Sequence, residues 1–175
     1  GAKRHLDDFE AELRRRYELK SGGRLGPEPD DDKQAMVLNR VVTWGPEGLT
    51  LEADPRQVEK VLLELGLDDD TKGAATPGLK ATKTQLAEDG PLDEDKHTLF
   101  RGVSARCNYV SNDRPDVNFA AKEVCRAMAS PTTLSLGALK RLGRYFNDRR
   151  RLVYAYPFQR ADGIQVYIDT DWAGC

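Results

Sequence analysis

Three consecutive segments between residues 93 and 148 carry apolar side chains at helical spacing, and this pattern constrains the fold most strongly. The connections between them are short and include Pro115 and Pro131, which are compatible with helix starts. The apolar positions are Leu99, Phe100, Val103, Cys107 and Val110 in the first segment, Val117, Ala120, Ala121, Val124, Cys125 and Met128 in the second, and Leu134, Leu136, Leu139, Leu142, Tyr145 and Phe146 in the third. Because each apolar face must be buried against another element, the sequence predicts an α-helical bundle.

The N-terminal part of the chain combines helical and strand patterns. Apolar side chains recur at helical spacing within residues 6–17, which predicts a short amphipathic helix. Residues 36–44 are apolar and β-branched, and a Gly-Pro-Glu-Gly turn leads from them into residues 49–52, which predicts a β-hairpin. Together with the helical bundle, these elements predict an α+β fold.

A further helix is predicted directly after the hairpin. Asp54 followed by Pro55 is typical of an N-cap and a first helical position, and Gly66 is typical of a helix end. Residues 67–92 contain few large apolar side chains and many Asp, Lys, Thr, Gly and Pro residues, so they bury little surface. We therefore predict that residues 67–92 form an exposed connector.

The C-terminal residues alternate apolar and polar side chains, which predicts strands at 152–156 and 164–169. The second strand ends in Asp169, and Asp171 follows it closely. A carboxylate at a strand end can bind Mg²⁺, which prefers oxygen ligands and takes only one or two of them from the protein. Its partner carboxylates would have to follow Cys175, so we expect this sequence to be a piece of a longer chain. The alternative for Asp169 is an ordinary acid in a turn.

Composition excludes several classes of protein. Charged residues make up 32% of the 175, and no apolar run approaches the roughly 20 residues of a membrane span. No apolar signal core follows the first residues, so secretion is not indicated. The cysteines are Cys107, Cys125 and Cys175. Their wide spacing suits neither a disulfide framework nor a metal site, which predicts reduced thiols in an intracellular protein, two of them in the core.

Basic side chains gather near the end of the third predicted helix of the bundle, although the net charge is only −2. They are Lys140, Arg141, Arg144, Arg149, Arg150 and Arg151. Such a cluster suits binding to a polyanion. An equally weighted alternative is a solvated helix end, where cations favour the C-terminal end of the helix dipole.

Several local patterns occur in an order that resembles a known family. They are the hairpin-to-helix segment 49–67, the residues 100–118 with Arg101-Gly102-Val103, Asn108-Tyr109 and Arg114-Pro115-Asp116, the stretch Ser130-Pro131 followed by residues 139–146, and the Asp-x-Asp-Trp-Ala-Gly stretch within 167–175. In this order the chain resembles the copia-type retrotransposon Pol polyprotein, from the end of its reverse-transcriptase region through the first strand of its ribonuclease H.

The resemblance implies a division of the chain into four parts. Residues 1–66 would be the end of the reverse-transcriptase palm, with a helix, a hairpin and a helix. Residues 67–92 would be the exposed connector, and 93–150 a helical bundle like a thumb or connection domain. Residues 151–175 would hold the first strands of an incomplete domain like ribonuclease H.

The resemblance also implies a function for the parent protein. It would be an RNA-directed DNA polymerase with a two-metal ribonuclease H, and both activities would use Mg²⁺. Asp169 would be the first nuclease carboxylate and metal ligand, with Asp171 as a second candidate. Neither active site would be complete in this chain, so we expect no activity from it alone and no tight Mg²⁺ binding.

The same resemblance implies partners and a location. The partners would be an RNA–DNA hybrid or template–primer and the remainder of the polyprotein, with no membrane. The protein would be intracellular, in a cytoplasmic particle or the nucleus. Among the cations, Lys140, Arg141 and Arg144 are the first candidates for phosphate contact, and Arg149 to Arg151 the second.

Alternatives from other classes stay open. The chain could be a non-catalytic helical module that binds nucleic acid or has a structural role, or an inactive relic of a retroelement. Arg114 and Asp116 are interpreted as a local ion pair that fixes the turn between two helices, in preference to a nucleic-acid contact. Tyr109 and Tyr145 are interpreted as core aromatics.

Overall fold

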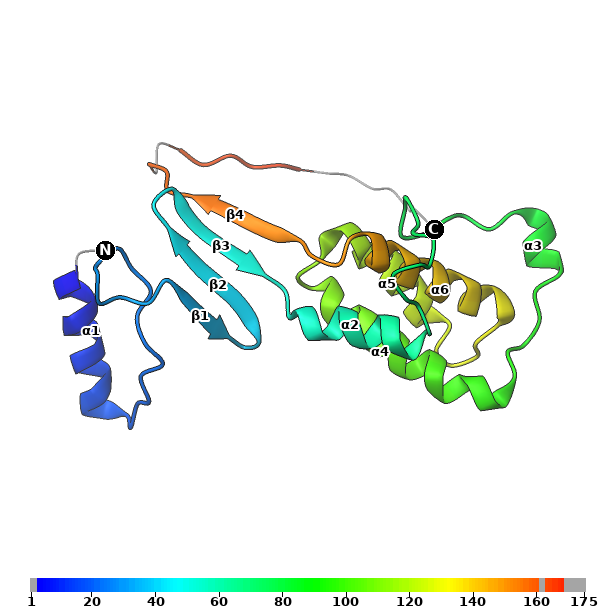
Figure 1. Ribbon diagram of the computed structural model, residues 1–175, viewed down its shortest axis with the longest axis horizontal. Coiled ribbons are helices and arrows are strands. Elements are labelled where there is room, and N and C mark those ends of the chain that lie inside the picture. Colours follow the sequence, from blue (N-terminus) through cyan, green and yellow to red (C-terminus); the bar gives the residue numbers. More distant parts are fainter. Residues whose placement is uncertain (1–2, 161–162, 169–175) are drawn as a thin grey trace.

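A computed structural model of the protein describes residues 3–160 and 163–168. Its long axis runs from helix α1 (Lys3–Arg16), through a four-stranded sheet, to a bundle of helices (Figure 1). The bundle consists of α2 (Pro55–Glu64), α4 (His97–Ser111), α5 (Pro115–Arg126) and α6 (Thr133–Asp148). A short helix α3 (Lys83–Ala87) and a 3₁₀ turn η1 (Glu94–Lys96) lie between α2 and α4 in the sequence. The predicted α+β class is therefore confirmed.

The sheet has the order β1-β2-β3-β4, and all neighbouring strands are antiparallel. Its strands are β1 (Gln34–Val37), β2 (Arg40–Gly45), β3 (Gly48–Glu52) and β4 (Val153–Pro157). The prediction of one strand over residues 36–44 is wrong, because the chain turns back within it. Leu38 and Asn39 have φ angles of 51° and 65°. These left-handed conformations belong to a tight hairpin turn, which Asn tolerates better than most residues.

The last strand joins the N-terminal sheet. Tyr154 of β4 lies opposite Leu51 of β3, and Tyr156 lies opposite Leu49. The predicted strand at 152–156 is thus confirmed within one residue. The second predicted strand is wrong over its described part, because residues 163–168 have no regular secondary structure and Ile164 is 92% exposed. Alternating side chains do not make a strand unless another strand completes the hydrogen-bond ladder.

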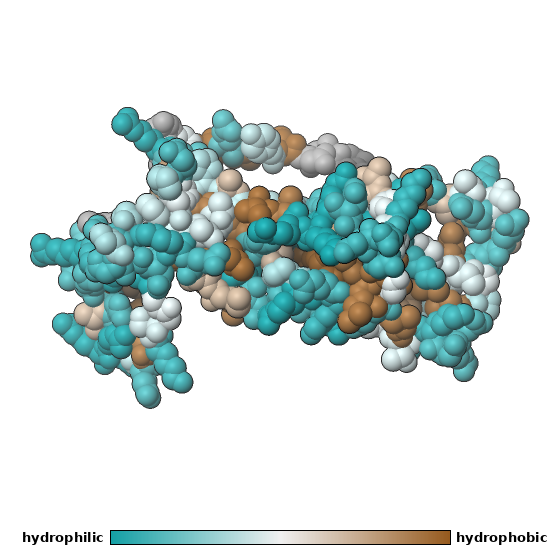
Figure 2. All heavy atoms as spheres, in the orientation of Figure 1, coloured by the Kyte–Doolittle hydropathy of each residue, from teal (hydrophilic) through white to brown (hydrophobic). Residues whose placement is uncertain are grey.

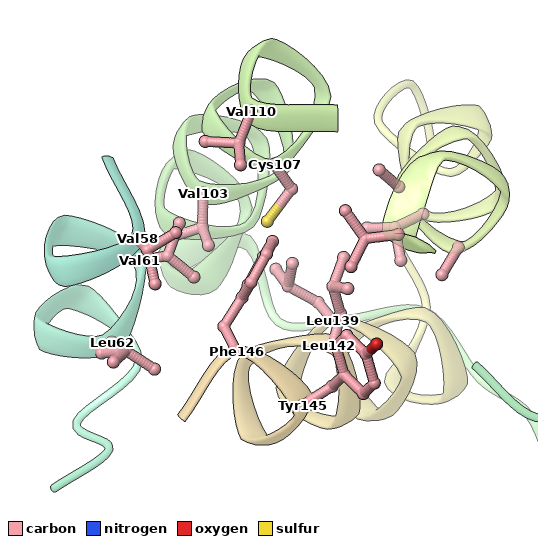
Figure 3. Packing of buried hydrophobic residues seen from close by; sticks show 14 of the residues in the cluster. Val58, Val61, Leu62, Val103, Cys107, Val110, Leu139, Leu142, Tyr145 and Phe146 are labelled. Atoms are coloured by element: carbon pink, nitrogen blue, oxygen red, sulfur yellow. The ribbon is translucent and has the colours of Figure 1, made fainter. Parts of the chain in front are cut away.

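The core lies between the helices of the bundle. Phe146 of α6 points toward Cys107 and Val103 of α4, while Val61 of α2 packs from the side (Figure 3). All four side chains have no measurable exposure. The three helices predicted in this region are confirmed, and α2 joins them as a fourth, because Val58, Val61 and Leu62 belong to the same cluster.

Most residues of the connector between α2 and η1 are exposed, as its composition predicts, yet both of its ends lie against the bundle. Its first part lies along α6, where the side-chain amide of Asn147 donates to the carbonyl oxygens of Asp68 and Thr71, at 2.8 and 3.1 Å. Its last part is held at the other end of α6, where Leu92 N–H donates to the Pro131 carbonyl at 2.9 Å. Ala74 and Leu92 are buried in the core. These two side chains and the hydrogen bonds to α6 hold the connector in place, although it contains few large apolar residues.

Hydropathy differs along the molecule (Figure 2). The end that carries α1 shows mostly hydrophilic residues, whereas hydrophobic residues reach the surface over the sheet and between the helices. None of the four strands holds a buried residue. The helical bundle therefore supplies most of the core.

Candidate nucleic-acid interface

Helix α6 carries the cations that the sequence singles out. The helix begins with a capping box, in which the Thr132 hydroxyl accepts from Ser135 N–H at 3.1 Å and the Ser135 hydroxyl accepts from Thr132 N–H at 2.8 Å. Leu139 and Phe146 anchor its inner side in the core with no measurable exposure. Anchoring on one side fixes the direction in which the outer side chains leave the helix.

Lys140 and Arg144 lie four residues apart on α6, so they share one face of the helix. Lys140 is exposed and Arg144 is half-buried. Within residues 3–160 and 163–168, neither side chain forms an ion pair or a hydrogen bond. Both charges are therefore available to a ligand.

Arg141 is bound to the connector. Its Nη2 donates to the Thr76 hydroxyl at 2.8 Å, and that hydroxyl donates to the Gly78 carbonyl at 3.1 Å. The Nε of Arg141 is buried without a hydrogen-bond partner among the described atoms. Arg141 therefore helps to hold the connector, and only part of its guanidinium is presented outward.

The three arginines after α6 all have carboxylate partners. Arg149 contacts Asp148 at 2.7 Å, and Arg150 pairs with Asp69 of the connector. These pairs are partly exposed and contribute at most about 1 kcal/mol each. They nevertheless neutralise the second group of predicted candidates, which separates it from Lys140 and Arg144.

Arg151 pairs with Glu52 of β3. Its Nε and Nη2 donate to the two carboxylate oxygens at 2.6 and 2.7 Å. These hydrogen bonds hold the pKa of Glu52 below its ordinary value, although partial burial opposes the shift. Arg151 therefore connects the end of the bundle to the sheet.

Arg114 is the most deeply buried charged side chain among the described residues, with 1% exposure. Its Nε and Nη2 donate to the Asp116 carboxylate at 2.9 and 2.8 Å. Nη2 also donates to the Arg149 carbonyl at 3.1 Å, and the guanidinium lies 5.3 Å from the centre of the Phe146 ring. The predicted local ion pair is confirmed, and it also holds the backbone that follows α6.

The two tyrosines predicted as core aromatics, Tyr109 and Tyr145, differ in their exposure to solvent. Tyr145 is 7% exposed and donates its hydroxyl to Asp116 at 3.0 Å, so its prediction as a core aromatic is confirmed. Tyr109 is 42% exposed, so the same prediction is wrong for it. It lies on the side of α4 away from Val103 and Cys107.

The cysteines in the described chain are free thiols. Cys107 is fully buried, and burial raises its pKa to about 12. The thiol of Cys125 donates to the Ser104 carbonyl at 3.4 Å, and desolvation raises its pKa as well. The prediction of reduced core thiols is confirmed for Cys107, and Cys125 is partly buried. Neither suits a nucleophile at neutral pH.

The predicted metal ligands Asp169 and Asp171 lie outside the described residues. Within the part of the chain that the structure describes, no group of three or more His, Cys, Asp or Glu side chains is placed to hold a metal ion. The assignment of Mg²⁺ to Asp169 therefore stays a prediction.

Comparison with known proteins shows what the chain is similar to. An uncharacterized mitochondrial protein of Arabidopsis thaliana is 30% identical over 132 residues, which are 74% of this chain and 52% of that protein. The retrovirus-related Pol polyproteins from transposons RE1 and RE2 of the same plant are each 29% identical over 103 residues, 59% of this chain and 7% of theirs. The chain is thus similar to retrotransposon Pol polyproteins. The predicted resemblance is confirmed at this level.

The matched part of the chain spans about half the length of the mitochondrial protein and a small part of the two polyproteins. No family model matches the chain, and no solved structure matches it. Among the residues that the structure describes, no helix is long and apolar enough to cross a membrane.

Proposed function

We propose that this chain is part of a copia-type retrotransposon Pol polyprotein that combines an RNA-directed DNA polymerase with a ribonuclease H. Its own role is to hold the template–primer, an RNA–DNA hybrid, through the exposed face of α6. The proposal is carried by the similarity to two Pol polyproteins together with Lys140 and Arg144 of that face, which have no ion-pair partner within residues 3–160 and 163–168.

The chemistry of the ligand fits this face. An A-form hybrid is recognised mainly through its phosphates and sugars, so cations on a rigid surface are sufficient and side chains that read bases are not needed. Lys140 and Arg144 are separated by about 6 Å along the helix axis. Since α6 is anchored by Leu139 and Phe146, the helix positions that carry the two cations are fixed before the nucleic acid binds.

The nuclease part of the proposal concerns the C-terminal residues. Asp169 would be the first carboxylate of a magnesium site, and Asp171 a second candidate. When bound, the metal activates water and stabilises the leaving oxygen. Further carboxylates from the remainder of the polyprotein would complete the site.

Binding of a fluorescently labelled RNA–DNA hybrid, followed by anisotropy over a range of salt concentrations, tests the role of α6. The double variant Lys140→Gln, Arg144→Gln should bind more weakly, and the slope of log K against log[salt] should fall by about 2. The matched control is Arg15→Gln, Arg16→Gln, which removes two charges that pair with Glu12 on α1. Equal slopes for the two double variants would contradict the proposal.

A further inference from the structure

The acidic run Asp68–Asp70 lies against the basic end of α6. Asp69 forms an ion pair with Arg150 across 81 residues of sequence. The same Arg150 nitrogen also donates to the Asn147 side chain at 2.8 Å. Asp69 is 88% exposed and the Arg150 side chain 44%, so the pair faces the solvent.

The connector is held in this position by contacts that do not involve charge. Gly73 packs so closely on α6 that a Cβ atom there would lie 2.7 Å from Cβ of Asp148. Ala74 is buried, and its N–H donates to the Arg144 carbonyl at 3.3 Å. Asp69 therefore stays close to Arg150 even when their ion pair is open.

A carboxylate and a phosphate are alternative partners for one guanidinium. Both are oxygen anions that accept the same charge-assisted hydrogen bonds from arginine. A solvent-exposed ion pair is weak and is easily exchanged for another anion. Arg150 follows α6 by two residues, so it lies at the end of the helix that carries Lys140 and Arg144.

We propose that Asp69 is an intramolecular competitor for nucleic-acid phosphate at Arg150. In the free protein the acidic run covers this cation, so that hybrid binding begins on the open face of α6. A hybrid that extends past Arg144 displaces Asp69 and gains one more phosphate contact. This inference rests on the proposed role of α6.

The test compares two substitutions that change the charge equally. Asp69→Asn releases Arg150, whereas Asp70→Asn alters a side chain that forms no ion pair within the described residues. In hybrid-binding titrations at one salt concentration, Asp69→Asn should raise the affinity about three- to fivefold over Asp70→Asn, because Arg150 no longer has to leave a carboxylate before it contacts a phosphate. In an Arg150→Gln background, Asp69→Asn should bring no gain over Asp70→Asn.

The outcomes separate this inference from the proposed function. Equal affinities for Asp69→Asn and Asp70→Asn would overturn the competition, while loss of binding in the Lys140, Arg144 double variant would still support the role of α6. If that double variant also bound like its control, both would fall. Circular dichroism of each variant establishes that the helices are intact.

Discussion

The guanidinium of Arg114 forms a bidentate ion pair with Asp116 inside the bundle, with Nε and Nη2 at 2.9 and 2.8 Å from the two carboxylate oxygens. The side chain of Arg114 is almost completely removed from solvent, and Asp116 is its carboxylate partner. Removing one member of a buried pair leaves the other charge without compensation. The pair is therefore a point at which the bundle is sensitive to a single substitution.

Arg114→Ala should lower the free energy of unfolding by about 3–5 kcal/mol, because it leaves the Asp116 carboxylate without a countercharge, with only the Tyr145 hydroxyl as donor, and removes the donor to the Arg149 carbonyl. Urea denaturation followed by circular dichroism measures the change. The control is Arg126→Ala, whose side chain is 71% exposed and pairs only with Glu123, and it should cost about 0.5 kcal/mol or less. Similar losses for both variants would show that the buried pair adds nothing.

Gly143→Ala should stabilise the protein less than alanine at an open position of the same helix. A Cβ at residue 143 would lie 2.6 Å from Leu65 Cδ1 and 2.7 Å from Leu67 Cδ1, so these two side-chain ends must move, which offsets the helix-forming gain of alanine. Gly137→Ala meets nothing within 4 Å and should stabilise by about 0.5–1 kcal/mol. In thermal unfolding the Tm of Gly137→Ala should therefore rise above that of Gly143→Ala; equal Tm values would refute the close contact.

Asp54 makes part of the stability dependent on pH. Hydrogen bonds from the side chain of Arg56 hold its pKa below the ordinary value, against the effect of burial. Because the folded pKa is the lower one, this contribution is complete above the unfolded value of about 3.9 and is lost as the pH falls through the folded value.

In Asp54→Asn this contribution is absent, while the amide can still cap α2. The free energy of unfolding, measured by urea titration between pH 5 and pH 2.5, should therefore fall less steeply than in the wild type. The two proteins should differ most at pH 5 and converge at the acidic end. Parallel curves would mean that the Asp54 carboxylate carries no net stabilisation.

Asp169→Asn should abolish cleavage of an RNA–DNA hybrid in a protein that continues through the whole nuclease sequence. Loss of a metal-binding carboxylate removes several kcal/mol of transition-state stabilisation, so we expect a decrease of about 100-fold or more. Asp171→Asn should have a smaller effect. Cleavage is measured with a labelled hybrid at saturating Mg²⁺, and an active Asp169→Asn protein would exclude this residue from the site.

The helices could be predicted from the sequence because their signals are local. The Asp54–Pro55 start of α2 is observed with its cap, and Leu139, Leu142 and Phe146 are buried as their spacing predicts. The turn at Leu38 and Asn39 was missed, since Leu38 is rarely found at positive φ and continues an apolar run. Asn39 was the available signal for a turn.

The candidate interface was predictable only in part. The Arg114–Asp116 pair spans two residues, so its partners could be read from the sequence. The partners of Arg150 and Arg151 lie 81 and 99 residues away, and charge patterns along the chain do not reveal such pairs. The structure therefore adds which cations pair with carboxylates, namely Arg149, Arg150 and Arg151. Lys140 and Arg144 form no such pair within the described residues.

The register of β3 and β4 gives the molecule an unusual topology. Glu52 lies opposite Val153, so the last residue of one strand neighbours the first residue of the other, and about 100 residues of chain leave and return between them. The bundle is in effect an insertion within a small sheet. β1, β2 and β3 are joined by tight turns, whereas β4 can pair with β3 only after the intervening helices have folded. The ladder that completes the sheet is thus expected to form late, and the speed of that step is set by the folding of the bundle.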